Sequence, residues 1–157
     1  MRIESKSLFS QIIIGGVGIF ALIGIFMTTA LASDRFLNNN DGTVTDVKTG
    51  LMWAAKDNEN PINWSDAHAY CQNYSGGGHT DWRLPTLTEL ASLYDPKYKN
   101  KRGYNVPKLI ETSAQSIWAS ETRGFEAARF NFTYGQVFWL RQTYSGPTRA
   151  LPVRIGK

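Results

Sequence analysis

The segment GGGHTDWRLPT, at residues 76–86, separates two predicted helices and decides how they meet. Its three glycines give the backbone the freedom that commonly ends a helix. Trp82 is expected to anchor the core. A buried charge without a partner is costly, so Asp81 and Arg83 are each expected to be paired. The segment is therefore predicted to be a structural corner and not a catalytic loop.

Both helices that flank this corner have recognisable start signals. Asn63 can cap a helix over residues 64–73, whose apolar residues recur at helical spacing on one face. Pro85 fixes the direction of the chain before the second helix. Thr86, with Glu89 three residues later, forms the pattern of a capping box. The corner is thus predicted to hold two capped helices together.

Short β-prone runs precede and follow the helices. The first two runs are joined by a turn at residues 46–50, which predicts a β-hairpin. The last run contains Pro152, which suits an edge strand or a bulge. Because helices and strands are segregated along the chain, the predicted fold is α+β with an antiparallel sheet. The predicted strands are residues 43–45, 51–53, 117–120, 125–133, 137–140 and 149–155.

The first 32 residues have the pattern of an export signal. Basic residues precede an uncharged apolar run at residues 12–27, and an Ala-x-Ala ending follows. We predict a cleaved signal peptide at residues 1–32 and an exported domain at residues 33–157. An uncleaved anchor stays open as the alternative, because residues 12–32 are about long enough to span a bilayer.

Charge and cysteine content narrow the functional classes. The formal net charge of +4 is modest, which favours acidic partners and disfavours nucleic acid for an exported chain. The single cysteine, Cys71, allows no internal disulfide, so packing must hold the core. Cys71 also fits the apolar face of the first helix. It is therefore predicted to be a small buried hydrophobe and not a nucleophile.

Patterns for metal binding or catalysis are weak. Two histidines, a cysteine and an aspartate occur between residues 68 and 81, but a zinc site needs three or four converging ligands with supporting partners. If residues 39–42 are aligned with an EF-hand calcium loop, acidic side chains are missing at its ligand positions, so these residues are predicted to form a turn. No pair of carboxylates is singled out by its spacing for glycoside hydrolysis. We expect no metal, no cofactor and no catalytic residue, and the chain is predicted not to be an enzyme.

The segment KYKNKRGYNVPK, at residues 97–108, is the main candidate binding site. It interleaves cations with tyrosines. Such a mixture suits anionic sugar polymers, because the cations meet sulfate or carboxylate while the rings cover apolar sugar faces. An ordinary solvated loop is the alternative. The predicted ligand-binding residues are Lys97, Tyr98, Lys99, Lys101, Arg102, Tyr104 and Lys108.

Taken together, these motifs resemble the Lcl C-terminal domain family, named after the C-terminal domain of the Legionella collagen-like adhesin. The most specific string is DWRLPT at residues 81–86. Similar patterns occur at residues 35–36, 40–46, 49–53, 64–71, 118–122, 130–135 and 153–154. The motif residues expected to be structural are Trp53, Trp64, Cys71, Asp81, Trp82, Arg83, Pro85, Thr86, Glu89 and Trp118.

The resemblance implies a C-type-lectin-like fold, a secreted or periplasmic location in the bacterial cell envelope, and binding of sulfated polysaccharides such as glycosaminoglycans. Two departures stand out. Many members carry a cysteine in the last strand that could pair with the one matching Cys71, but here Pro152 fills that place, so the implied disulfide is missing. No collagen-like Gly-X-Y stalk precedes the domain, which predicts a stand-alone exported domain.

Three functional hypotheses follow. The first is an exported, non-enzymatic adhesion module for acidic polysaccharide or another anionic envelope or host component. It would contact the membrane only if the N-terminal segment stays uncleaved, and an oligomer stays open. The second is a cell-envelope module for a protein or peptide, favoured by an exposed apolar patch near Trp139 and Tyr144. The third, an enzyme related to the formylglycine-generating branch of lectin-like folds, is disfavoured by the lone Cys71.

Overall fold

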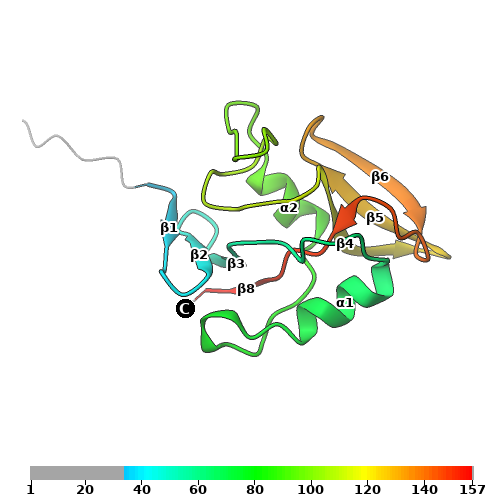
Figure 1. Ribbon diagram of the computed structural model, residues 1–157, viewed down its shortest axis with the longest axis horizontal. Helices are drawn as coiled ribbons and strands as arrows, with labels where there is room; N and C mark the ends of the chain where they lie inside the picture. Colours follow the sequence, from blue (N-terminus) through cyan, green and yellow to red (C-terminus); the bar gives the residue numbers. More distant parts are fainter. Residues whose placement is uncertain (1–33, 157) are drawn as a thin grey trace, which may run out of the picture. The chain divides into compact units, whose positions relative to one another are not determined.

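The first sheet grows from the predicted hairpin. In the computed structural model, which describes residues 34–156, β2 (Thr43–Asp46) and β3 (Leu51–Ala54) pair antiparallel. β1 (Phe36–Asn38), which the sequence did not indicate as a strand, pairs with β2, and β8 (Val153–Ile155) pairs with β3. The sheet order is β1-β2-β3-β8. The first and last strands of the domain therefore share one sheet (Figure 1).

The second sheet has the order β6-β5-β4-β7. β4 (Ser116–Arg123), β5 (Glu126–Asn131) and β6 (Gln136–Arg141) form an antiparallel meander, whereas β7 (Thr148–Arg149) runs parallel to β4. Figure 1 shows β6 at the outer edge of this sheet. The α+β class is confirmed, but the expected single antiparallel sheet is replaced by two sheets, one of which contains a parallel pair.

The predicted last strand at residues 149–155 is wrong, because the chain divides there between the two sheets. β7 ends at Arg149 and β8 begins at Val153. Pro152 lies between them, where its missing N–H costs no ladder hydrogen bond. Its carbonyl accepts a hydrogen bond from the Ala54 amide at 2.9 Å. Proline thus marks the point at which the chain changes sheets.

Both helices begin at their predicted caps. In α1 (Trp64–Gln72), the Asn63 side chain accepts a hydrogen bond from the Asp66 amide. In α2 (Leu87–Leu93), the Thr86 hydroxyl accepts from the Glu89 amide at 3.2 Å, while the Glu89 carboxylate accepts from the Thr86 amide at 2.8 Å. The capping box predicted from the sequence is therefore complete.

The glycines of the corner turn the chain back toward the core. They form the short 3₁₀ turn η1 (Gly76–Gly78), in which Gly77 has a φ of 63°, a value that disfavours other residues. Trp82 follows with 3% of its surface exposed, and its indole N–H donates to the Gly76 carbonyl at 3.2 Å. Its ring meets the Tyr74 ring nearly edge-on, with centroids 5.0 Å apart. Trp82 thus anchors the corner in the core.

Both charges of the corner are paired, as predicted, although 60% of the Asp81 side chain and 41% of the Arg83 side chain are exposed; the buried charge that needs a partner is Arg154, at 4%. Asp81 accepts two hydrogen bonds from Arg154 in β8, at 2.7 and 3.2 Å. Arg83 donates two hydrogen bonds to Glu89 in α2, at 2.8 and 2.6 Å. Hence Asp81 ties the corner to the first sheet, and Arg83 ties it to the second helix.

Two apolar clusters cover opposite faces of the second sheet. Successive residues of a strand point to opposite faces, so Ile117 joins the cluster that contains Leu90 of α2, while Trp118 joins the cluster that contains Cys71 of α1. The first cluster also includes the fully buried Trp53 of β3, which links the two sheets. The indole N–H groups of Trp64 and Trp118 donate to the carbonyls of Ala119 and Ile62, each at 2.8 Å.

Cys71 is buried and forms no disulfide within the described residues. Burial raises the pKa of its thiol well above the ordinary value, so the sulfur is held in the neutral form. This environment matches the predicted small hydrophobe. Within residues 34–156, no three histidine, cysteine, aspartate or glutamate side chains gather as metal ligands.

The predicted signal peptide at residues 1–32 lies outside the described residues. Among the helices that the structure does describe, none combines the length and apolar character needed to cross a membrane.

Acid should destabilise this fold through Asp46 and Glu89. Burial would raise the pKa of each carboxyl, but hydrogen bonds from Arg35 and Arg83 lower both pKa values below the ordinary 3.8 and 4.5. Each carboxylate therefore stabilises the fold above its ordinary pKa, and this stabilisation is lost as pH falls through the folded-state value. We expect the free energy of unfolding, measured by urea titration, to decrease as the pH is lowered from about 4.5.

The variant Asp46→Asn provides the control for this acid dependence. Because it removes one of the carboxyls whose pKa the fold lowers, its free energy of unfolding should depend less steeply on pH below about 4.5. A wild-type free energy that stays constant down to about pH 3 would contradict the assignment of these carboxylates.

Candidate functional site

Two buried asparagines shape the predicted binding segment at residues 97–108. The Asn100 carboxamide accepts from the amides of Arg102 and Tyr104, at 3.0 and 3.1 Å, and donates to the Thr112 hydroxyl at 3.1 Å. Only 6% of Asn100 is exposed. This buried carboxamide fixes the turn that presents Lys101 and Arg102 to solvent.

Asn105 holds the two sides of the same segment together. Its carboxamide donates to the Pro96 carbonyl at 2.9 Å and accepts from the Lys99 ammonium at 3.2 Å. Its own backbone amide donates to the carbonyl of Phe132, the residue directly after β5, at 2.9 Å. The segment is therefore anchored to the second sheet and has a defined shape.

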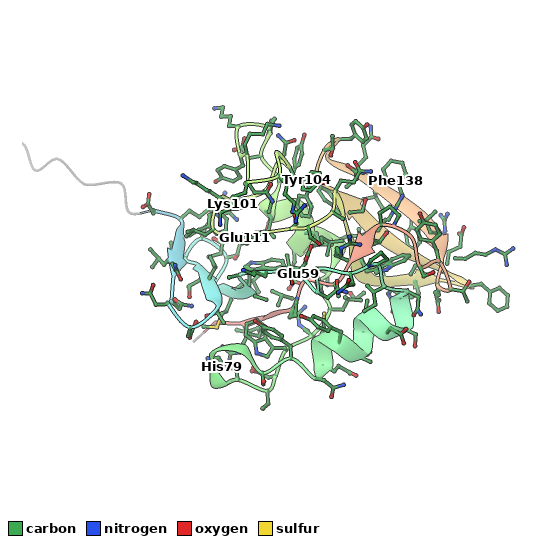
Figure 2. All side chains as sticks on the ribbon, viewed as in Figure 1. Glu59, His79, Lys101, Tyr104, Glu111 and Phe138 are labelled. Carbon is green, nitrogen blue, oxygen red and sulfur yellow. The ribbon has the colours of Figure 1, made fainter. Side chains whose placement is uncertain are left out.

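Two lysines converge on Glu111. The Lys101 ammonium forms an ion pair with one carboxylate oxygen, and Lys56 lies 3.8 Å from the other. The backbone brings them together, because the Glu111 amide donates to the Ala55 carbonyl at 2.8 Å. The hydrogen bond from Lys101, aided by the charges of Lys56 and Arg102, lowers the pKa of Glu111. Figure 2 shows Lys101 and Glu111 side by side.

A row of three hollows surrounds these lysines, and we call it the lysine groove. The central hollow has a volume of about 420 Å³. A polar hollow of about 270 Å³ shares Lys56, Lys101 and Glu111 with it, and an aromatic hollow of about 410 Å³ shares Lys108 and Leu109. The central hollow is lined by Asn38, Ala55, Lys56, Lys101, Lys108, Leu109 and Glu111.

Positive charge is concentrated in the central hollow, where three lysines face the single carboxylate of Glu111. The polar hollow is balanced, since Asp57 and Glu59 also line it. The Asp57 carboxylate is already engaged: it accepts from the Ser113 amide at 2.5 Å and from the Glu59 amide at 2.8 Å. The central hollow is thus the part of the groove that suits an anion.

The structure brings together only some of the seven residues predicted to bind ligand. Lys101, Arg102, Lys108 and Tyr98 line the groove, and Tyr98 packs edge-on against Phe36 with ring centroids 6.1 Å apart. The residues that do not line it are Lys97, Lys99 and Tyr104. Both tyrosine rings are half-buried against the first apolar cluster, but only Tyr98 lines one of the hollows.

Sequence reasoning missed several residues that line the groove. Lys56 and Glu111 form a β-bridge between segments that are distant in the chain, and Arg35 and Phe36 reach the aromatic hollow from β1 and the residue before it. No local pattern marks these residues as partners of the basic segment. Only the folding of the first sheet against that segment places them there.

A second exposed surface lies along β6. Arg129 has its guanidinium carbon 5.7 Å from the ring centroids of both Phe138 and Tyr144, and Arg123 lies 4.4 Å from the ring of Trp139. Figure 2 shows Phe138 well away from Lys101 and Glu111. We call the exposed apolar residues of β6 and of the loop after it the β6 patch: Val137 on one face of the sheet, and Phe138 and Tyr144 on the other. The protein-binding hypothesis looks for an exposed apolar patch near Trp139 and Tyr144, and Tyr144 is exposed here.

The comparisons with known proteins identify the family. A family model described as the Lcl C-terminal domain matches residues 42–154, a range that contains both helices and all of the second sheet. A search of curated proteins finds no match to the chain. The family match includes the DWRLPT string and both caps, and it confirms the resemblance drawn from them. The chain belongs to the Lcl C-terminal domain family.

Proposed function

We propose that this chain is an exported, non-enzymatic adhesion module that binds acidic polysaccharide in the lysine groove. The observation that carries this proposal is the convergence of Lys56, Lys101 and Lys108 on one hollow with a single carboxylate. Ammonium groups pair with sulfate or carboxylate as compact point charges, which requires little from the orientation of the anion. A sulfated or uronic polymer such as a glycosaminoglycan is the ligand class that this hollow fits.

The groove also offers what the uncharged parts of a sugar chain need. The aromatic hollow is lined by the half-buried Tyr98 beside Lys108, with the buried Phe36 behind it, and 37% of the Leu109 surface is exposed between the central and aromatic hollows. Apolar and aromatic side chains cover the C–H faces of sugars. Because the three hollows are contiguous, several consecutive sugar units can lie along the groove.

The family supports an adhesive role, because it takes its name from the C-terminal domain of the Legionella collagen-like adhesin. We infer a C-type-lectin-like arrangement, which is supported by the two helices and by the pairing of the first and last strands within one sheet. The N-terminal pattern at residues 1–32 supports a secreted or periplasmic location.

The triple variant Lys56→Ala/Lys101→Ala/Lys108→Ala should bind heparin about three- to 150-fold more weakly than the wild type, because exposed ion pairs contribute roughly 0.2–1 kcal/mol each. Conversely, Glu111→Gln should bind more tightly, because it removes the carboxylate that competes for two of these lysines. Calorimetry at low and high salt measures both effects, and wild-type affinity should fall as salt rises.

A matched control removes the same kind of charge elsewhere. Arg123→Ala/Arg141→Ala takes two cations from the β6 surface, and this variant should keep wild-type affinity for heparin. If the lysine variant bound normally, or if only the arginine variant lost binding, the groove would not be the polysaccharide site.

A further inference from the structure

β6 is a free sheet edge of unusual length for this domain. Among the described strands, the other edges are β1, β7 and β8, which have only two or three residues, whereas β6 has six. The pairing of β6 with β5 is continuous from Gln136 to Arg141, without a bulge, and β6 contains no proline. Proteins commonly shorten, bulge or charge an edge strand to prevent further pairing. Here only Arg141, at the end of the strand, provides such protection.

The hydrogen bonding shows which backbone groups of β6 face outward. The Gln142 amide donates to the Phe125 carbonyl at 2.9 Å, and antiparallel pairs alternate along a ladder. The backbone groups of Val137, Trp139 and Arg141 therefore point away from β5. The Arg141 carbonyl accepts from the Tyr144 amide at 2.9 Å. Within residues 34–156, the outward groups of Val137 and Trp139 have no backbone partner.

The side chains around this edge indicate the chemistry of its partner. Arg123, Arg129 and Arg141 exceed the single carboxylate of Glu126, which pairs with Arg123 at 2.8 Å. Arg129 donates one hydrogen bond to the Thr148 hydroxyl at 2.9 Å, while its buried Nε has no acceptor among the described residues. An acidic partner complements this charge, whereas a second copy of the chain would place like charges together.

We propose that β6 binds an extended segment of a partner protein, in which acidic and apolar residues alternate, by strand addition. The segment's backbone would pair with the outward groups of Val137 and Trp139. Its apolar side chains would lie against Phe138 and Tyr144 on one face of the sheet, and its carboxylates would meet Arg123 and Arg141 on the other face. This function is separate from polysaccharide binding, because it uses a different surface of the domain.

Fluorescence anisotropy with a labelled peptide of alternating glutamate and valine tests the proposal. The variant Val137→Pro removes an outward amide that β5 does not use, and an edge strand tolerates proline at such a position. We expect it to bind the peptide at least about tenfold more weakly than the wild type. The matched control Val137→Thr keeps the amide and should bind within about twofold. A lysine–valine peptide should bind the wild type more weakly than the glutamate–valine peptide.

Amide exchange by NMR gives a second readout that needs no variant. The peptide should slow exchange at the amides of Val137 and Trp139, whereas those of Phe138 and Leu140 are already protected by β5. The lysine-groove triple variant should still bind the peptide, so failure of the polysaccharide proposal can be told apart from failure of this one.

Three results would overturn the proposal. One is the absence of saturable binding and of exchange protection with the glutamate–valine peptide. Another is equal affinity for the acidic and basic peptides. The third is sedimentation data showing a dimer of the wild type that Val137→Pro abolishes, because such a dimer would assign this edge to a second copy of the chain.

Discussion

Replacing Trp118 by alanine should lower the free energy of unfolding by about 3–5 kcal/mol, the cost typical of truncating a large buried aromatic side chain. Trp118 of β4 is fully buried against α1, in the cluster that contains Ala67 and Cys71. Its indole N–H also donates to the Ile62 carbonyl at 2.8 Å. The substitution would leave both a cavity and an unpaired carbonyl. Urea denaturation followed by far-UV circular dichroism measures the loss.

Phe125→Ala is the control for this prediction. Phe125 lies between β4 and β5, and 88% of its surface is exposed. Its truncation should therefore change the free energy of unfolding by less than about 0.5 kcal/mol. Equal losses for Trp118→Ala and Phe125→Ala would show that α1 does not pack on the second sheet as described.

The second large effect is expected for Glu89→Ala, at about 2–3 kcal/mol of stability. Loss of the capping interaction with Thr86 accounts for about 1 kcal/mol. The remainder comes from Arg83, which loses both of its hydrogen bonds to Glu89. Since 41% of the Arg83 side chain is exposed, water offsets part of this loss and keeps it below that of a fully buried pair. Thermal and urea unfolding measure the change.

Two glutamate variants separate these contributions. Glu89→Gln keeps an oxygen that can accept from the Thr86 amide. Its free energy of unfolding should therefore lie between that of the wild type and that of Glu89→Ala. Glu126→Ala removes the exposed ion pair with Arg123 and should cost less than about 1 kcal/mol. A loss for Glu126→Ala as large as that for Glu89→Ala would refute the structural role of Glu89.

Much of the helical part of the fold could be predicted because its signals are local. The Thr86–Glu89 capping box and the Asn63 cap each depend on hydrogen bonds between residues three apart, so the pattern in the chain specifies the contact. The same holds for the hairpin of β2 and β3, whose turn lies between two β-prone runs. Trp82 was predicted to anchor the core from its place in the corner segment, and it is buried in the core.

The strands that pair with distant partners could not be predicted in this way. β1 has only three residues, and it is a strand only because it pairs with β2. Residues 149–155 read as one strand, yet the chain there divides between two sheets, because β7 pairs with β4 and β8 pairs with β3. Propensity describes a segment, whereas sheet membership depends on what lies beside it.

By itself, the sequence determined the family, the α+β class, the two capped helices and the basic character of residues 97–108. The tertiary structure decided which of those basic residues share a groove, since Lys56 and Glu111 join Lys101 only through a bridge between distant segments. It also decided that β6 is the long free edge, because strand order is a property of the assembled sheet. Local hydrogen bonds are encoded by neighbours in the chain, whereas surfaces are assembled by packing between residues far apart in it.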